Sequence, residues 1–312
     1  MQFDDLQQRR ENERAYQRSR SILKSKHTSE KTPVLRSIKA SNIASQPKYS
    51  PLRYPGGKTW LIPQIREWLG QHPIPLLVEP FAGGATASLV AILEGYAERS
   101  VMIERDPYIS ALWRTILSRD AEWLVDKIMS FKCNRKNAKR VLREYPRTFR
   151  HAAFQAIVRN RVCRGGILNN SAKLMRKGER GRGIRSRWYP ETLALRIAQI
   201  YNHRQRFTFI HGDGIQAIQH FAQTLDEVRF FVDPPYPIED YPLRRRLYTY
   251  NQLNHQRLFA VLASVPHDFL MTNDDSRFIR EIGREANFLL TSIRMRNAHG
   301  LPRRELLIRP HQ

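Results

Sequence analysis

Short apolar segments alternate with helical patterns over most of this sequence, and that alternation limits the possible folds more than any other feature. We predict strands at residues 76–78, 101–103, 207–210, 228–232, 269–271, 288–294 and 306–308, and helices at 86–93, 108–117, after 214 and at 254–263. Strands and helices in this order form a mostly parallel sheet with helices on both faces. The last two strands are separated only by a turn at 297–302, so we expect a hairpin that places one antiparallel strand in the sheet.

Two stretches depart from this alternation. Residues 129–204 are crowded with Arg and Lys and include a Gly/Arg run at 177–183, so we predict a small, mainly helical subdomain inserted there. Residues 1–46 are polar, carry mixed charges and lack an apolar stripe, which is typical of a basic, flexible arm. The flanking residues, 47–128 and 205–312, then form one α/β domain.

The charge balance indicates a polyanionic partner. Lys and Arg number 53 against 29 Asp and Glu, a net charge of +24 with neutral His, which favours nucleic acid. No apolar run reaches the roughly 18 residues that a membrane span needs, and the charged N-terminus lacks the apolar core of a secretory signal. Cys133 and Cys163 suit neither a disulfide framework nor a metal site. We therefore expect a cytoplasmic protein with no membrane partner and no metal.

A small-residue turn, residues 79–85, follows the first predicted strand. Glycines such as Gly83 and Gly84 let backbone N–H groups approach a ligand at the carboxyl edge of a parallel sheet. Glu104 ends the next predicted strand, where a carboxylate can accept hydrogen bonds from ribose hydroxyls. The pattern G-x-G-x-x-G is absent, so the turn favours a nucleoside-containing ligand over a dinucleotide.

A second glycine turn, Gly56-Gly57-Lys58, superficially resembles the end of a phosphate-binding loop. That loop requires a glycine five positions before Gly57, where this chain has Leu52, and it requires a preceding strand. We therefore exclude a P-loop NTPase. A tight turn with an adjacent lysine still suits the carboxylate of a ligand.

The most specific pattern is Asp233-Pro234-Pro235-Tyr236, directly after a predicted strand. The prolines cannot donate to a sheet, so they end the strand and hold the next residues extended. The Asp233 carboxylate and the Pro234 carbonyl form an acceptor pair that fits an amino group. Tyr236 offers a flat face on which a base can stack.

The chain resembles the Dam-like class of adenine-N6 DNA methyltransferases in five features and in their order along the sequence. They are the segment 54–58, the segment 79–84, Glu104, Asp213 and the segment 233–236. The resemblance runs from about residue 51 to residue 308. The segment 159–166 is similar to the one that opens the target-recognition region of this family. Residues 177–190 differ from the aromatic and Asn-rich segment that often follows in this family. The difference bears on which DNA sequence is recognised and not on the methyl-transfer reaction.

The resemblance implies a Rossmann-like methyltransferase sheet and S-adenosyl-L-methionine as cofactor. It implies that Asp233, Pro234, Pro235 and Tyr236 hold a flipped adenine, and base flipping costs a few kcal/mol that these contacts offset. It also implies a cofactor site that includes Glu104 at the ribose, Lys58 at the methionine carboxylate and Asp213 near the adenine. The remaining cofactor residues are Tyr54, Gly57, Glu79, Phe81, Gly83 and Gly84.

We expect the arginines beside this site to contact nucleic acid, and double-stranded DNA is the expected partner. They are Arg164, Arg182, Arg185 and Arg187 in the insertion, and Arg244, Arg245, Arg246 with Tyr248 after the tetrad. RNA and single-stranded DNA stay open as substrates, because their adenines carry the same amino group. A relative that binds DNA without catalysis, and a restriction endonuclease as partner, also stay open.

Overall fold

The computed structural model describes residues 46–53, 57–166, 168, 172–178, 181–237, 253–296 and 302–311. Within them lies a seven-stranded sheet of order β3-β2-β1-β4-β5-β7-β6. The strands are β1 (Ile74–Glu79), β2 (Ala97–Glu104), β3 (Phe207–His211), β4 (Arg229–Val232), β5 (Phe269–Asp274), β6 (Phe288–Arg296) and β7 (Pro302–Pro310). Strands β1 to β5 pair in parallel, and β7 runs antiparallel to both β5 and β6. The predicted α/β, Rossmann-like sheet with one antiparallel strand is confirmed.

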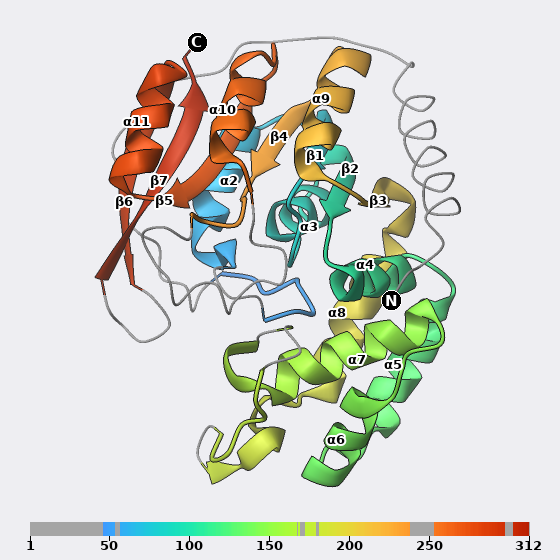
Figure 1. The fold of residues 1–312 in the computed structure, drawn as a ribbon. Helices are drawn as coiled ribbons and strands as arrows, with labels where there is room; N and C mark the ends of the chain where they lie inside the picture. The colour runs from blue at the N-terminus through green and yellow to red at the C-terminus, as the bar shows by residue number, and fades with distance from the viewer. Residues whose placement is uncertain are drawn as a thin grey trace.

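Helices cover both faces of the sheet (Figure 1). Helices α2 (Ile62–Leu69), α3 (Thr86–Leu93) and α4 (Pro107–Ile116) pack into one hydrophobic core, and α9 (Gly214–Thr224), α10 (His255–Ala263) and α11 (Arg277–Glu285) into another. Alternation along β1 supplies both cores, because Leu77 enters the first while Leu76 and Val78 enter the second. No helix in the described part of the chain is both long and apolar enough to cross a bilayer.

The sequence analysis does not predict α2 and α11, although both have a helical apolar spacing. Ile62, Ile65 and Leu69 are buried along one side of α2. Helix α11 begins after Ser276, whose hydroxyl accepts the Ile279 N–H at 3.3 Å, and it buries Ile282. This helix carries the chain from β5 to β6, and it thereby places β6 parallel to β5.

The segment between β2 and β3 is mainly helical and lies below the sheet in Figure 1. It contains α5 (Asp120–Ser130), α6 (Arg135–Arg143), α7 (Phe149–Val162) and α8 (Pro190–Asn202), with short 3-10 helices η3 (Arg164–Gly166), η5 (Gly183–Arg187) and η6 (Arg204–Arg206). Trp113 of α4, Ile157 of α7 and Ile197 of α8 belong to one hydrophobic cluster. The insertion therefore continues the sheet's core, and the predicted boundary at residue 129 falls inside α5.

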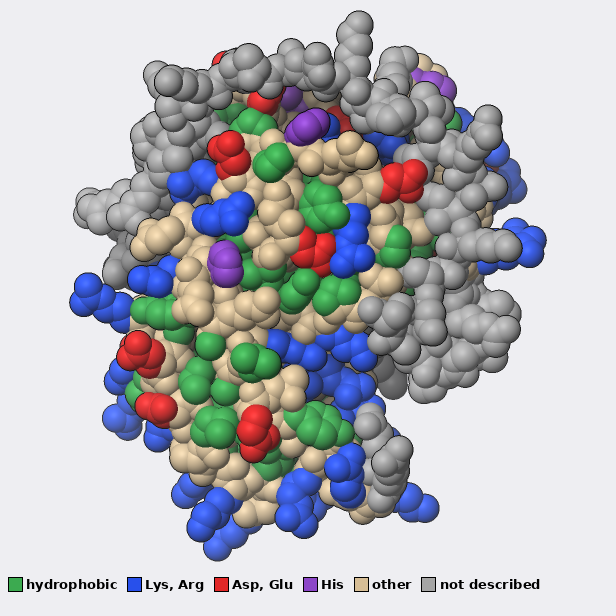
Figure 2. Space-filling view, turned by 180° about the vertical axis from the view of Figure 1, so that it is seen from behind, with side chains coloured by type: hydrophobic (Ala, Val, Ile, Leu, Met, Phe, Trp, Pro, Cys, Tyr) green, Lys and Arg blue, Asp and Glu red, His purple; other side chains and the backbone are tan. Residues whose placement is uncertain are grey.

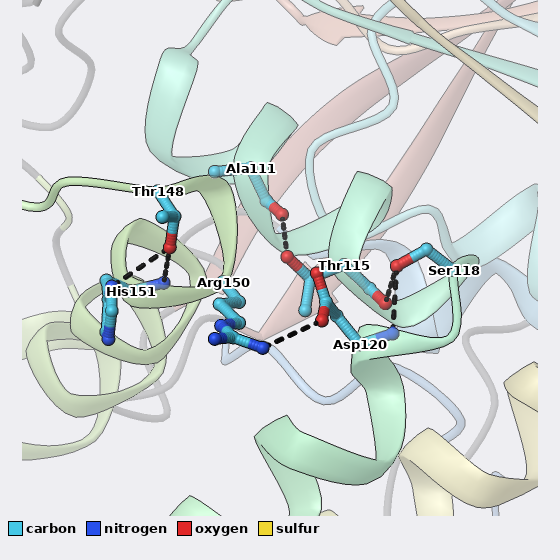
Figure 3. A network of polar contacts seen from close by, with 7 residues as sticks. All are labelled: Ala111, Thr115, Ser118, Asp120, Thr148, Arg150 and His151. Carbon is cyan, nitrogen blue, oxygen red and sulfur yellow. Dashed lines mark hydrogen bonds and ion pairs between the residues drawn. The ribbon is translucent and has the colours of Figure 1, made fainter.

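A network of polar contacts fixes the path from α4 into α5 and α7 (Figure 3). Thr115 donates its hydroxyl to the Ala111 carbonyl at 2.7 Å, and Ser118 donates to the Thr115 carbonyl at 3.0 Å. The Arg150 guanidinium of α7 lies 3.2 Å from Asp120 at the start of α5. These contacts hold α5 and α7 side by side under α4.

Candidate functional site

The candidate site lies where the strand order of the sheet reverses. Strands β1 and β4 are parallel neighbours, with Leu77 opposite Arg229 and Val78 opposite Phe230, while the chain continues outward to β2 on one side and β5 on the other. Ligands of open α/β sheets bind at the carboxyl ends of the strands at such a point. Here those ends carry the turn 80–85 after β1 and the tetrad 233–236 after β4.

Asp233 leaves the end of β4 with one carboxylate oxygen fixed by the protein. Its Oδ1 accepts a hydrogen bond from Thr272 Oγ1 at 2.8 Å and lies 2.8 Å from Lys58 Nζ. The Asp233 side chain is 23 % exposed. Its Oδ2 makes no hydrogen bond or ion pair with any residue in the described part of the chain. One oxygen is therefore anchored, and the other is available to a ligand.

Lys58 opens the short 3-10 helix η2 (Lys58–Leu61) and is 3 % exposed. Its Nζ lies 3.8 Å from Glu305 Oε2 and 5.1 Å from the centroid of the Tyr236 ring. Burial alone would lower the pKa of Lys58, but attraction to Asp233 and Glu305 outweighs burial and raises that pKa well above its usual value. The sequence analysis expects Lys58 to contact a methionine carboxylate, whereas in the structure its ammonium group contacts the Asp233 carboxylate.

The tetrad is held from two further elements. Tyr236 donates its hydroxyl to Glu305 Oε2 at 2.9 Å, and the Pro235 carbonyl lies 3.0 Å from His255 Nε2. Glu305 comes from β7 and is 7 % exposed. Burial raises the pKa of Tyr236 well above its usual value, so the phenol stays neutral at physiological pH.

Three residues of this cluster, Thr272, Glu305 and His255, are absent from the sequence predictions. Their positions beside the tetrad depend on the pairing of β5 with β7 and on where α10 packs. One sequence signal was available for Glu305, which is a charged residue at the start of the apolar run 306–308. A buried acid whose pKa is shifted by its surroundings is a common sign of a functional site.

The turn after β1 is built around Glu104. Its carboxylate accepts backbone N–H groups from Gly83 at 2.9 Å, Arg105 at 2.8 Å and Asp106 at 2.9 Å. Gly83 takes a φ of +48°, and its carbonyl accepts the Trp113 indole N–H at 2.9 Å. Burial raises the pKa of Glu104 to about 7. A carboxylate has about four acceptor positions, so Glu104 keeps capacity for a ligand hydroxyl.

Glu79 and Asp213 support helices beside the turn. Glu79 is 2 % exposed, and it accepts the N–H and the hydroxyl of Ser88 at the start of α3. We therefore assign Glu79 to the support of α3 and not to ligand contact. Asp213 caps α9 by accepting the Ile215 N–H at 3.0 Å. Phe81 packs closely against Gly214, where a Cβ atom would collide with the Phe81 ring.

A cavity of about 380 Å³ opens beside this turn. Its lining includes Gly57, Thr59, Gly84 and Thr86 together with three arginines, Arg53, Arg161 and Arg196. Gly83, Phe81 and Glu104 do not line the cavity. The cavity therefore extends from the second glycine of the turn toward the helical insertion.

Arg161 is buried, at 4 % exposure. It donates to the Pro51 carbonyl, while its Nε has no hydrogen-bond partner within the described ranges. Neither Arg161 nor Arg196 lies within ion-pair distance of a carboxylate of any residue that the structure describes. Burial, together with Arg196 and Arg53, lowers the pKa of Arg161 to about 9. The cavity is therefore suited to an anion.

The predicted nucleic-acid contacts lie partly within the described structure. Arg164, Arg182 and Arg185 are exposed on the insertion, and Arg187 is half-buried at the end of η5. Lys and Arg side chains are spread over the helical part of the face in Figure 2, with hydrophobic side chains among them. Tyr54 and the predicted contacts 244–246 and 248 lie outside the described residues.

Comparison with known proteins gives distant similarity only. No protein-family model matches the chain, and no curated protein matches it. Among solved structures, the rRNA methyltransferase AviRa from Streptomyces viridochromogenes is similar at 13% sequence identity, with a TM-score of 0.36, over 82% of this chain and 86% of that chain. A likeness this distant says nothing about substrate.

Proposed function

We propose that this protein is a site-specific DNA adenine-N6 methyltransferase that uses S-adenosyl-L-methionine. One observation carries the proposal: at the point where strand order reverses, Asp233 is anchored through Oδ1 and keeps Oδ2 for a ligand. An acceptor held in this way suits an exocyclic amino group. The turn with Gly83 and Gly84, which lets a nucleoside cofactor approach the backbone, lies at the end of the neighbouring strand.

In the proposed reaction, Asp233 Oδ2 and the Pro234 carbonyl accept the two amino hydrogens of a flipped adenine. These contacts direct the nitrogen lone pair toward the methyl donor, and Tyr236 stacks on the base. S-adenosylmethionine supplies a methyl group already activated by its sulfonium. The new N–C bond would form as the C–S bond breaks and S-adenosylhomocysteine leaves, and the methylated nitrogen would then lose one proton to solvent. The protein's contribution is therefore positioning and charge placement.

The residues around the turn fit such a cofactor. Glu104 holds the turn through three N–H groups and retains acceptor capacity for ribose hydroxyls. The carboxylate of the methionine portion would be met by Arg161 and Arg196 in the neighbouring cavity, because Lys58 is engaged by Asp233. Gly57 and Gly84 allow close approach of the ligand to the backbone.

Incubation with labelled cofactor and three substrates tests the proposal. Duplex DNA, single-stranded DNA and RNA are offered in parallel, and N6-methyladenine is identified by mass spectrometry. We expect methylation of duplex DNA, and its loss in Asp233→Ala with cofactor affinity changed by no more than a few-fold. Asp226→Ala, an exposed position on the loop before β4, is the matched control. Turnover by Asp233→Ala would exclude the assigned role, and methylation of RNA alone would identify the alternative substrate.

A further inference from the structure

A second and larger cavity, of about 750 Å³, lies between α5, α6 and α7. We call it the α5–α7 groove, and Trp123, Lys127, Arg140, Tyr145, Arg147 and Phe154 are the lining residues that matter most. Among the described residues, none lines both this groove and the cavity beside Gly84. Its volume lies within the range of binding pockets for small molecules.

The floor of the groove is apolar and preformed. Val141 and Phe154 are both 8 % exposed, and the Phe154 ring meets Phe131 edge-on with centroids 5.4 Å apart. Gln155 donates from Nε2 to the carbonyls of Val141 at 2.6 Å and Glu144 at 2.5 Å. These bonds fix the end of α6 against α7, so the groove does not depend on a ligand for its shape.

The rim combines aromatic rings with positive charge. Tyr145 is 71 % exposed, so its ring is accessible to a ligand. Trp123 meets His151 edge-on at 5.1 Å, and Thr148 fixes that histidine through Nδ1 at 2.9 Å (Figure 3). Among the residues that the structure describes, the groove is lined by four cationic side chains and one carboxylate. The cations are Lys127, Lys132, Arg140 and Arg147, and the carboxylate is Glu144.

The acid does not neutralise this rim. Glu144 lies 3.9 Å from Arg140, and both side chains are largely exposed, so the ion pair is weak and screened by salt. The groove therefore offers apolar, aromatic and cationic surface together.

We propose that the α5–α7 groove binds an unpaired stretch of nucleic acid. Bases of a duplex are stacked internally and cannot enter a recess, whereas an unpaired base can stack on Tyr145 and reach the apolar floor. The cations then meet the flanking phosphates. An acidic peptide would use the cations and leave the aromatic surface unmatched. This binding goes beyond methyl transfer and does not depend on it.

Fluorescence anisotropy with labelled short single strands of RNA and DNA, and with a duplex of the same sequence, tests the groove. Tyr145→Ala should weaken single-strand binding about tenfold, because one stacked base is lost, and should leave duplex binding unchanged. Arg140→Gln combined with Arg147→Gln should weaken single-strand binding and lower the slope of log affinity against log salt by about 0.7 per lost phosphate contact. Arg277→Gln on α11, at 92 % side-chain exposure, is the matched control.

Measuring single-strand binding and methyl transfer on the same variants distinguishes failure of the groove proposal from failure of the proposed catalytic function. Asp233→Ala should bind single strands as the unsubstituted protein does, even if it loses methyl transfer. Single-strand binding that survives Tyr145→Ala and the double arginine change would overturn the proposal. Equal competition by polyglutamate, with no effect of Tyr145→Ala, would show a surface that binds by charge alone and would overturn it as well.

Discussion

Lys58 Nζ lies 2.8 Å from Asp233 Oδ1, and this contact joins the start of η2 to the end of β4. The pair is buried on the lysine side and 23 % exposed on the aspartate side. Thr272 holds the same oxygen, so the carboxylate cannot rotate freely. The geometry of the proposed acceptor therefore depends on a residue that is remote in sequence.

Replacing Lys58 by Met should reduce kcat strongly and destabilise the fold. Asp233 and the buried Glu305 would lose their shared cation, and a broken buried pair costs about 3 kcal/mol at the low end of the usual range. Methyl incorporation and urea unfolding measure the two effects. Lys58→Arg keeps the charge and should retain more stability than Lys58→Met. Unchanged kcat and stability in Lys58→Met would show that the pair does not organise the site.

Glu305 should act on the reaction through the position of Tyr236. Glu305→Gln keeps an oxygen that can accept the Tyr236 hydroxyl, whereas Glu305→Ala removes the acceptor of the 2.9 Å bond. We expect Glu305→Ala to raise KM for nucleic acid and lower kcat, and Glu305→Gln to stay close to the unsubstituted protein in both. Steady-state kinetics on the two variants measures this difference. Equal losses in both variants would instead point to the charge of Glu305.

The local elements of this fold were predictable, whereas their contacts across the sheet were not. Apolar runs such as 101–103 and the proline pair after β4 predict a strand and its end from neighbouring residues alone. The Lys58–Asp233 and Tyr236–Glu305 contacts depend on which strands become neighbours. Composition also does not predict how the insertion packs, because Arg and Lys dominate its sequence. The apolar residues of α7, such as Ile157, belong to the same hydrophobic cluster as the helices on one face of the sheet.

Glu79 should make stability depend on pH. Burial raises its pKa from 4.5 to about 8, so the folded protein holds a proton that the unfolded chain releases at lower pH. This contribution to stability is complete below about pH 4.5 and is lost as the pH rises through 8. Glu79→Gln cannot ionise and should show a flatter dependence of the unfolding free energy across this window. Glu122→Gln, on the exposed side of α5, is the control and should follow the unsubstituted protein.

Arg161 should contribute to ligand binding and not to folding. Its buried guanidinium has one bond to the Pro51 carbonyl and no carboxylate partner in the described part of the chain, so the fold gains little from the charge. Arg161→Met should therefore lower the free energy of unfolding by no more than about 1 kcal/mol, the value of one ordinary hydrogen bond. The same change should weaken S-adenosylmethionine binding at least about tenfold, because a charge-assisted contact is worth about 1.5–3 kcal/mol. Calorimetric titration and urea unfolding give the two values on one sample. A large loss of stability with unchanged cofactor affinity would show that Arg161 stabilises the fold and does not bind the cofactor.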